Sequence, residues 1–474
     1  MTDKRIETVH FIGIGGVGMS GIARVAHDQG MKVSGSDLKE SRYTKQLKEA
    51  GIEVFIGHAA DNIPASAPDV VVVSTAILDN NPELIAARER ELAIWHRAKM
   101  LAALGVGKKT LAVAGTHGKT TTSSMLASTL DTMEEQPSFL IGGIVRSYGT
   151  NAHSGKGDYY VVEADESDKS FTYLDPLAVL VTNIEADHLD HYSGLEEIYG
   201  KFAEFIASVP PEGVCIACGE DAKLVEIAKA SCPSSVYTYG LSEDCDIRVT
   251  DYVTHGIGSD FTVTFPDGTS VAARIKQNPG IHNALNGAGV LATLWALGHP
   301  VERAAQALAA FSGVKRRFDL VGEVAGVTVV DDYAHHPTEI AATIEAAKKL
   351  DYNHVHVLFQ PHRYSRVPLF TEVLKEEFGC AFDEADSVTF MDVYPAGETP
   401  VPGVSGKTFL DVVLDHAGHP DAAYVPRRIE VVPYLSSKLS EGDLVITMGA
   451  GDVTAIGPQL VAVLEERETA VADR

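Results

Sequence analysis

A glycine-rich loop at residues 111–122, L-A-V-A-G-T-H-G-K-T-T-T, carries the clearest chemistry in the sequence. An apolar run leads into the loop, which ends in Lys119 and Thr120. Backbone N–H groups of such a loop wrap phosphates, the lysine reaches the β- and γ-phosphates, and the hydroxyl binds Mg²⁺. The spacing departs from G-x-x-x-x-G-K-S/T, because Val113 holds the outer glycine position and Gly115 comes two residues late. The strand, loop and helix context still predicts ATP binding rather than a structural loop.

Two acidic segments follow predicted strands in the same part of the chain: E-A-D-E-S-D at 163–168 and E-A-D-H-L-D-H at 185–191. Carboxylates at strand ends suit Mg²⁺, which takes one or two protein ligands and fills the rest of its shell with water and phosphate. A solvated loop acid or helix cap explains any single carboxylate equally well. Both clusters together, following a phosphate loop, favour a metal role. Zinc fits less well, because its sites use nitrogen and sulfur ligands.

A second glycine loop, F-I-G-I-G-G-V-G at 11–18, follows the first predicted strand. Gly13, Gly15 and Gly18 match G-x-G-x-x-G, whose tight turn brings backbone and a helix N-terminus to a pyrophosphate. Asp37 follows the second strand, where a ribose hydroxyl would be met. The loop predicts a pyrophosphate and ribose ligand, with a dinucleotide and a nucleotide diphosphate such as UDP both open, and a purely structural turn as the alternative.

Polar residues open a small-residue-rich helix after residue 280. Asn283 and Asn286 are three apart and share one helix face, so their amides could bond a base edge as Asn does with adenine. N-capping by Asn283 explains that residue equally well. Arg316 and Arg317 lie near a domain boundary and read either as an exposed linker pair or as a phosphate-binding hinge.

Two polar segments follow strands in the last third of the chain: D-D-Y-A-H-H-P-T-E at 331–339 and Q-P-H-R-Y-S-R at 360–366. Arg363 and Arg366 flank His362, and arginine grips carboxylates through two parallel hydrogen bonds. The pair predicts a site for a small carboxylate, with a surface loop of incidental charge as the alternative.

Short β-branched runs alternate with helix-length segments, and this pattern restarts twice, near residues 105 and 315. Such alternation is typical of βαβ units around a parallel sheet. We therefore expect an α/β fold of three domains, at 1–105, 106–315 and 316–474. Around 247–275 the pattern changes to alternating strands, which predicts an antiparallel excursion.

Composition narrows the class of protein. The 39 Lys and Arg against 65 Asp and Glu give a formal net charge of −26, which disfavours a nucleic acid partner. No apolar stretch approaches the roughly 20 residues of a membrane span, and the charged N-terminus does not resemble a signal peptide. Five cysteines predict reduced thiols and a cytoplasmic enzyme. Cys215 and Cys218 form C-x-x-C but lie in an apolar run, so we expect strand residues and not half of a zinc site.

Taken together, these residues resemble the Mur ligases, ATP-dependent amide-forming ligases of bacterial peptidoglycan synthesis. The resemblance covers all three expected domains. It rests on 115–121 with Glu163, D-H-L-D at 187–190, H-N-A-L-N at 282–286, Arg317 and Asp332. The first glycine loop, V-E-A-D-E-S-D, D-D-Y-A-H-H-P-T-E and Q-P-H-R-Y-S-R resemble in particular the members that join L-alanine to UDP-N-acetylmuramate.

The resemblance implies an architecture and a reaction. A Rossmann-like first domain would hold the UDP group, a central P-loop domain with a parallel sheet would hold ATP and Mg²⁺, and a Rossmann-like third domain would form a lid on the amino-acid side. ATP would phosphorylate the muramoyl carboxylate to an acyl phosphate, which L-alanine would attack. No nucleic acid, membrane or obligatory protein partner is expected.

The resemblance also implies residue roles. The residues expected to bind the nucleotide are Gly115, Thr116, His117, Gly118, Lys119, Thr120, Thr121, Asn283, Asn286, Arg317 and Asp332. Those expected to hold Mg²⁺ are Thr120, Glu163 and His188, and those expected to serve catalysis are Lys119, Glu163 and His188. Those expected to bind the substrates are Gly15, Gly16, Val17, Gly18, Asp37, Ser74, His335, His362, Arg363 and Arg366.

Three other functions compete with this one. A recycling ligase would attach a murein tripeptide to the same nucleotide sugar, but its glycine loop carries Cys and Phe, unlike G-I-G-G-V-G-M here. A nicotinamide-dependent oxidoreductase would explain the first glycine loop and Asp37 while leaving the phosphate loop unexplained. A non-catalytic nucleotide sensor would bind ATP without turnover.

Overall fold

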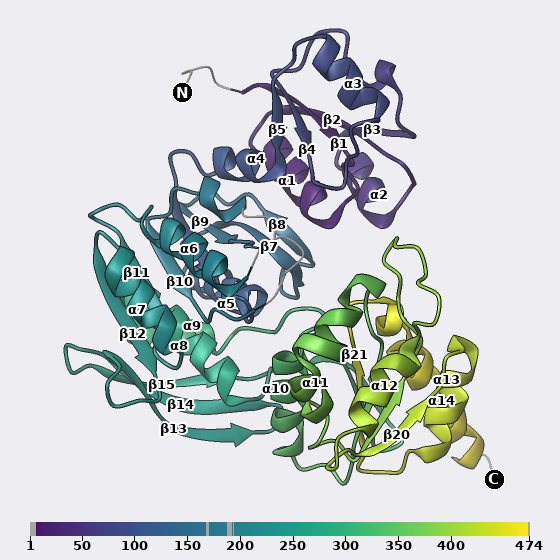
Figure 1. Ribbon diagram of the computed structural model, residues 1–474. Coiled ribbons are helices and arrows are strands. Elements are labelled where there is room, and N and C mark those ends of the chain that lie inside the picture. The colour runs from purple at the N-terminus through teal and green to yellow at the C-terminus, as the bar shows by residue number, and fades with distance from the viewer. Residues whose placement is uncertain (1–5, 167–169, 187–191, 193, 473–474) are drawn as a thin grey trace. The chain divides into compact units, whose positions relative to one another are not determined.

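The computed structural model describes residues 6–166, 170–186, 192 and 194–472, and its strands form three sheets (Figure 1). The chain divides into two compact units. One comprises residues 1–250, 262–272 and 285–311, and the other residues 251–261, 273–284 and 312–474.

The first sheet is parallel, with strand order β3-β2-β1-β4-β5. Its elements are β1 (Thr8–Ile12), α1 (Val17–Asp28), β2 (Lys32–Asp37), α2 (Arg42–Glu49), β3 (Glu53–Ile56), β4 (Val70–Val73), α3 (Pro82–Glu89), β5 (Ile94–His96) and α4 (Arg97–Leu104). Because β1 has β2 on one side and β4 on the other, the strand order reverses there. Ligands of open α/β sheets bind at the carboxyl ends of strands beside such a switch point.

The second sheet has ten strands in the order β15-β14-β13-β12-β11-β10-β6-β9-β7-β8. Its strands are β6 (Lys109–Ala114), β7 (Ser138–Val145), β8 (Thr150–His153), β9 (Tyr159–Glu163), β10 (Ala178–Val181), β11 (Val214–Cys218), β12 (Ser235–Gly240), β13 (Ile247–His255), β14 (Gly258–Thr264) and β15 (Ser270–Ile275). Its helices are α5 (Lys119–Thr132), α6 (Leu195–Ile206), α7 (Ala222–Ser231), α8 (Ile281–Ala296) and α9 (Val301–Leu308). β6 pairs in parallel with β9 and with β10, so the segments that follow these three strands reach the same edge of the sheet.

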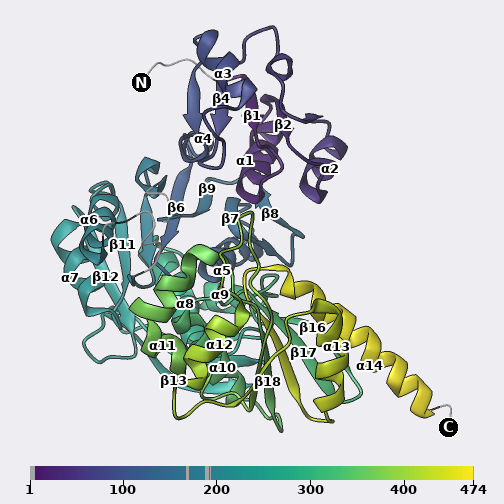
Figure 2. The same ribbon diagram turned by 45° about the vertical axis from the view of Figure 1, so that its right-hand side comes forward.

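The third sheet has the order β16-β17-β21-β18-β19-β20, and only its first pair is antiparallel among the pairs described. Its elements are β16 (Asp319–Val324), β17 (Val327–Asp332), α10 (Pro337–Lys348), β18 (Val355–Phe359), α11 (Lys375–Cys380), β19 (Ser387–Phe390), α12 (Gly406–Leu414), β20 (Asp421–Tyr424), α13 (Arg428–Lys438), β21 (Leu444–Met448) and α14 (Ile456–Ala472). Val330 belongs to one hydrophobic core cluster and Val329 to another, and the two clusters lie on opposite faces of the sheet. Figure 2 shows α13 beside α14, which contributes to the second cluster.

The structure confirms the α/β class and three successive sheets. β13, β14 and β15 are neighbours in chain order, and the two-residue connection between β13 and β14 requires antiparallel strands, as predicted. The structure adds several elements that the sequence patterns did not predict: β5, β8, β12, β16, β20, α4, α6, α7, α9, α12, α13 and α14. Many of these are short or lie at sheet edges, where the hydrophobic pattern is weak.

Cys215 and Cys218 are buried in β11, and all five cysteines are unpaired, which confirms the prediction of strand residues. No helix among the described residues is both long enough and apolar enough to span a membrane. The domain boundaries at 105 and 315 stay a prediction.

Candidate active site

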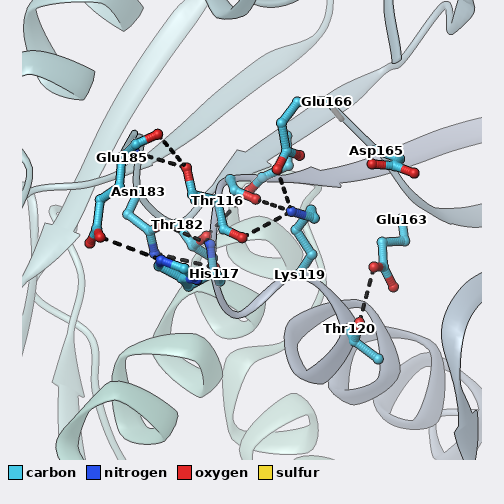
Figure 3. A network of polar contacts seen from close by, with 12 residues as sticks. Thr116, His117, Lys119, Thr120, Glu163, Asp165, Glu166, Thr182, Asn183 and Glu185 are labelled. Atoms are coloured by element: carbon cyan, nitrogen blue, oxygen red, sulfur yellow. Dashed lines mark hydrogen bonds and ion pairs between the residues drawn. The ribbon is translucent and has the colours of Figure 1, made fainter. Parts of the chain in front are cut away.

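The phosphate loop connects β6 to α5, as the sequence predicts (Figure 3). Gly115 has φ +131°, and a Cβ there would lie 2.1 Å from Oγ1 of Thr182. Gly118 has φ +83° and occupies the N-cap of α5, where the structure describes no capping side chain. Both positions therefore need glycine, and the amino end of α5 is left to an anionic ligand rather than to a side chain of its own.

Two residues after β10 hold this loop in shape. Thr182 donates its hydroxyl to the His117 carbonyl at 2.5 Å, and Oδ1 of Asn183 accepts the His117 N–H at 2.8 Å. The Asn183 carbonyl accepts the Thr116 N–H at 3.0 Å. Sequence reasoning missed both residues, although their position directly after a predicted apolar strand was a usable signal.

Lys119, the first residue of α5, has only 13% of its side chain exposed. Its Nζ donates to the carbonyls of Gly115 at 2.5 Å and Thr116 at 3.0 Å, and to Oε1 of Glu166 at 2.7 Å (Figure 3). Burial lowers the pKa of Lys119, but the carboxylates of Glu166, Asp165 and Glu163 outweigh it and raise the pKa above its ordinary value. Lys119 is therefore a fixed positive charge, already stripped of most water.

Carboxylates from the end of β9 surround this charge. Oε1 of Glu163 accepts the Thr120 hydroxyl at 3.0 Å, and Oε2 accepts the Gly142 N–H at 2.7 Å. Burial, and to a lesser degree Asp165, raise the pKa of Glu166 to about 7 despite the Lys119 ammonium. Glu166 belongs to the predicted acidic cluster, but its pairing with Lys119 was not anticipated.

The donors present fit the expected magnesium ion. The Thr120 hydroxyl and the Glu163 carboxylate are adjacent hard oxygen ligands beside the amino end of α5. His188, the third expected ligand, lies outside the described residues, as do Asp187 and Asp190. The structure brings Thr120 and Glu163 together beside the phosphate loop. Thr121, which is also expected to bind the nucleotide, has its side chain buried within α5.

The first glycine loop lies at the switch point of the first sheet. The Gly13 and Ile14 N–H groups donate to the Ser36 carbonyl at 2.8 and 2.9 Å. The Gly15 N–H donates to Oδ2 of Asp37 at 2.8 Å, and a Cβ on Gly15 would lie 2.9 Å from that oxygen. The structure therefore holds Asp37 directly against the loop, and its role in binding a ribose stays a prediction.

The other substrate-binding residues expected in the first sheet lie at this edge. Gly16 is the N-cap of α1 and Val17 its first residue, and no side chain that the structure describes caps the helix. Gly18 lies in its first turn. Ser74 is half-buried immediately after β4, the other neighbour of β1. A helix N-terminus with free N–H groups suits a pyrophosphate.

The buried carboxylate of Glu83 helps to position the first glycine loop. Glu83 of α3 accepts hydrogen bonds from Ser36 Oγ at 2.7 Å and Asn62 Nδ2 at 2.9 Å, and it lies 3.0 Å from His10 Nε2. Burial raises the pKa of Glu83, but the hydrogen bonds from His10, Asn62 and Ser36 outweigh it and lower the pKa. Since the Ser36 carbonyl holds the glycine loop, Glu83 positions that loop indirectly. Sequence reasoning missed it, because one acid in a helix carries no signal.

The two asparagines both lie in α8 and are buried. The helix begins at Ile281, so Asn283 is its third residue and the N-cap interpretation is wrong. Nδ2 of Asn283 donates to the Pro279 carbonyl at 2.9 Å. Asn286 lies against the phosphate loop, since a Cβ on Gly118 would approach its Oδ1 to 3.0 Å. A role for their amides in binding adenine stays a prediction.

Asp332 and the two arginines form a connected group at the start of the third sheet. Asp332 is buried, and its two oxygens accept the N–H groups of Phe318 and Ala334, each at 2.7 Å. Burial raises the pKa of Asp332 to about 6, against the lowering effect of Arg317. Arg317 contacts Glu339 at 3.5 Å, and Arg316 donates to the Gly449 carbonyl at 2.5 Å. The exposed-linker interpretation is therefore wrong, and Asp332 fixes the segment that carries Arg317.

The histidines and arginines expected near a carboxylate also come together. The rings of His335 and His362 lie 6.3 Å apart, and His362 stacks on Tyr394 with centroids 5.8 Å apart. Burial, then the charges of Arg366 and Arg363, lower the pKa of His362 to about 4. A neutral imidazole beside two guanidinium groups suits a carboxylate ligand. The specific role of each residue stays a prediction.

Comparison with known proteins places the chain in a family. Three family models match it: "Mur ligase family, catalytic domain" at 8–109, "Mur ligase middle domain" at 113–294 and "Mur ligase, glutamate ligase domain" at 316–451. A UDP-N-acetylmuramate--L-alanine ligase from Geotalea daltonii is 44% identical over 465 residues, 98% of this chain and 99% of that protein.

Solved structures of Mur ligases also match this chain. The UDP-N-acetylmuramate-alanine ligase from Thermotoga maritima matches with a TM-score of 0.79 and 29% identity, over 97% of this chain and 99% of that one. A murein peptide ligase from Psychrobacter arcticus matches with a TM-score of 0.70 and 24% identity, over 96% and 98%, and shows a shared fold.

The sheets and the phosphate loop thus define an α/β nucleotide-dependent enzyme. The chain belongs to the Mur ligase family, a family of ATP-dependent ligases.

Proposed function

We propose that this enzyme joins L-alanine to the carboxylate of UDP-N-acetylmuramate, converting ATP to ADP and phosphate and giving UDP-N-acetylmuramoyl-L-alanine. The similarity to the Geotalea daltonii and Thermotoga maritima ligases supports the choice of substrates. The observation that carries the chemistry is the largely enclosed Lys119 ammonium, held in a phosphate loop beside Thr120 and Glu163.

The geometry suits phosphoryl transfer to a carboxylate. A carboxylate is a poor acyl donor until it becomes an acyl phosphate, and that transfer depends on positioning and charge neutralisation more than on a protein nucleophile. Lys119 supplies a positive charge from a nearly dry site, and the α5 amino end supplies N–H donors. Bound phosphates take the place of Glu166 as partner of the ammonium.

The hard oxygen atoms beside Lys119 would hold a magnesium ion. Thr120 and Glu163 would hold the ion, with His188 as a further ligand, and the ion supplies neutralisation of phosphate charge. The excess of carboxylates over cations around Lys119 supports a site built for an added cation.

The substrates are assigned to the outer parts of the chain. Gly15, Gly16, Val17, Gly18, Asp37 and Ser74 bind the pyrophosphate and ribose of the UDP group. His335, His362, Arg363 and Arg366 bind the carboxylates of the muramoyl group and of L-alanine. The nucleotide is further bound by Asn283, Asn286, Arg317 and Asp332. We propose domains at 1–105, 106–315 and 316–474, supported by the three sheets and the three matched segments.

The competing functions explain less. The murein peptide ligase from Psychrobacter arcticus shares the fold at 24% identity, whereas the alanine ligase from Geotalea daltonii is 44% identical. A nicotinamide-dependent oxidoreductase leaves the phosphate loop and its acids without a role. A nucleotide sensor needs no carboxylate-binding cluster of the kind around His362. Five unpaired cysteines support a reducing compartment such as the cytoplasm.

A product assay tests the proposal. The protein should release phosphate from ATP and Mg²⁺ only when UDP-N-acetylmuramate and L-alanine are both present, with UDP-N-acetylmuramoyl-L-alanine detected by mass spectrometry. Replacing L-alanine with the murein tripeptide, and supplying NADH alone, test the two alternative activities. Failure to detect the alanine product would reject the proposal.

A further inference from the structure

Two histidines and an aspartate meet at the amino edge of the third sheet. His354 directly precedes β18, His356 lies within it, and Asp443 directly precedes β21. β18 and β21 are parallel, with Val355 opposite Leu444, so the three residues start neighbouring strands together. His362 follows the opposite, carboxyl end of β18, which places this cluster outside the candidate active site.

Their side chains already converge on one point. Nδ1 of His354 lies 2.9 Å from Oδ1 of Asp443, and Nε2 of His356 lies 3.3 Å from Oδ2. One ligand atom from each residue lies within 4.8 Å of the other two. His354 and His356 are two apart along an extended segment, so both side chains leave the same face of the sheet.

Neighbouring groups fix the orientation of the two more buried ligands. Nδ1 of His356 lies 2.7 Å from the Ser387 hydroxyl, which turns Nε2 toward Asp443. The Ser440 N–H donates to Oδ2 of Asp443 at 2.8 Å. Metal-bound histidines and carboxylates are oriented by the same kind of outer hydrogen bonds.

Charge and exposure also suit a cation. Asp443 is 2% exposed and His356 13%, whereas His354 is 57% exposed and leaves the cluster open to solvent. The buried Asp443 carboxylate faces the Ser440 N–H at 2.8 Å and the two imidazoles at 2.9 and 3.3 Å. The nearby Lys348 ammonium is neutralised by Asp386 at 2.8 Å.

We propose that His354, His356 and Asp443 bind a divalent transition metal, with Zn²⁺ the best match, and that the ion joins β18 to β21. Two imidazoles and one carboxylate suit zinc, whereas Mg²⁺ and Ca²⁺ prefer oxygen ligands alone. Tetrahedral zinc, with bonds of about 2.0–2.2 Å, places its ligand atoms about 3.3 Å apart. The separations of 2.9 and 3.3 Å end on the two different oxygens of Asp443, and one atom of each residue lies within 4.8 Å of the others, so side-chain rotation brings the three ligands to this spacing and water can complete the shell.

The competing explanation is a pair of ordinary hydrogen bonds between histidine and carboxylate. His416 provides a matched control, since its Nε2 lies 2.8 Å from Asp383 at the surface. In the described part of the chain, that pair has no third histidine, cysteine or carboxylate close enough to form a site.

Metal titration separates the two explanations. The full-length, metal-free protein is titrated with Zn²⁺ against a chromophoric chelator, and with Co²⁺, whose visible absorption reports tetrahedral coordination. Wild type and His416→Gln should each bind one equivalent of metal at this cluster. His354→Gln and His356→Gln should lose that equivalent or bind it at least about tenfold more weakly. Ligase activity of His354→Gln should equal that of wild type, because the cluster is outside the catalytic residues.

Folding of each variant is checked by near-UV circular dichroism. His354 is largely exposed, so its substitution leaves the core intact even if His356→Gln does not fold. If His354→Gln retains all zinc binding, or if wild type shows no tetrahedral cobalt spectrum, the cluster is only hydrogen-bonded and the proposal is overturned. Because the readout is metal binding, it fails or succeeds independently of the proposed ligase activity.

Discussion

Lys119 is the residue on which ATP turnover depends most directly. Lys119→Ala should lower kcat at least about 10²-fold, because removing one preorganised charge from a dry site costs that much or more. The variant should stay folded, since Glu166 already has a pKa of about 7 and can bind a proton when its partner is gone. Phosphate release and circular dichroism measure the two effects.

A lysine away from the phosphate loop provides the matched control. Lys223→Ala removes an exposed lysine that pairs with Glu226 at 2.8 Å, and it should leave turnover unchanged. Retained activity in Lys119→Ala would remove the phosphate-loop assignment.

Glu166 also makes stability depend on pH. Its pKa rises from 4.5 to about 7 on folding, chiefly through burial. Between these values the native state binds more protons than the unfolded state, so this residue's contribution to the free energy of unfolding falls as pH rises. Glu166→Gln removes that contribution. Urea unfolding from pH 4.5 to 7 should show the wild type losing stability relative to the variant, by up to about 1 kcal/mol per pH unit. Parallel curves would contradict the assignment.

At the scale of elements, α3 supports a loop that it does not contain. Glu83 binds Ser36, whose carbonyl holds Gly13 and Ile14 of the first glycine loop. Glu83→Ala leaves several buried donors unpaired and should lower the free energy of unfolding by about 3 kcal/mol. It should also raise the KM for the UDP substrate more than the KM for ATP, because only the first sheet loses its support.

The same helix offers the control. Glu89 is exposed at the end of α3, so Glu89→Ala should change stability by less than about 0.5 kcal/mol. Chemical denaturation and initial rates at varied substrate concentration test both variants. An equal rise in both KM values for Glu83→Ala would show general loosening and not a role in the first loop.

At the scale of the whole molecule, the two compact units should unfold separately. Both tryptophans of the chain, Trp95 and Trp295, belong to the unit built from residues 1–250, 262–272 and 285–311. Tryptophan fluorescence therefore follows that unit alone, whereas far-UV circular dichroism follows both. We expect the two transitions in urea not to coincide, since two-state behaviour is typical of single domains.

Nucleotide binding should stabilise the unit that contains the phosphate loop. The phosphate loop lies in the unit with the tryptophans, so ATP should shift the fluorescence transition to higher urea. At about 100 times the dissociation constant, the gain is about 2.7 kcal/mol. Coincident transitions that move together would show that the chain unfolds as one cooperative body.

Much of the local structure follows from sequence alone. The strand, loop and helix around 111–122, the glycines at 13 and 15, and the alternation of strands and helices all reflect patterns spanning a few residues. Backbone sterics and hydrophobic period act over that range, so the α/β class and both phosphate-binding loops could be predicted. Short edge strands such as β8 and β20 could not, because half-buried segments of four residues carry little period.

Tertiary structure alone decided which distant groups meet. Sequence could place Lys119 near phosphates, but only strand order brings Glu166 to its ammonium and Asn183 to its loop. Glu83 reaches Ser36 across 47 positions and Asp443 reaches His354 across 89. Such pairings depend on sheet order and register, which are determined by the packing of the whole core rather than by any local pattern.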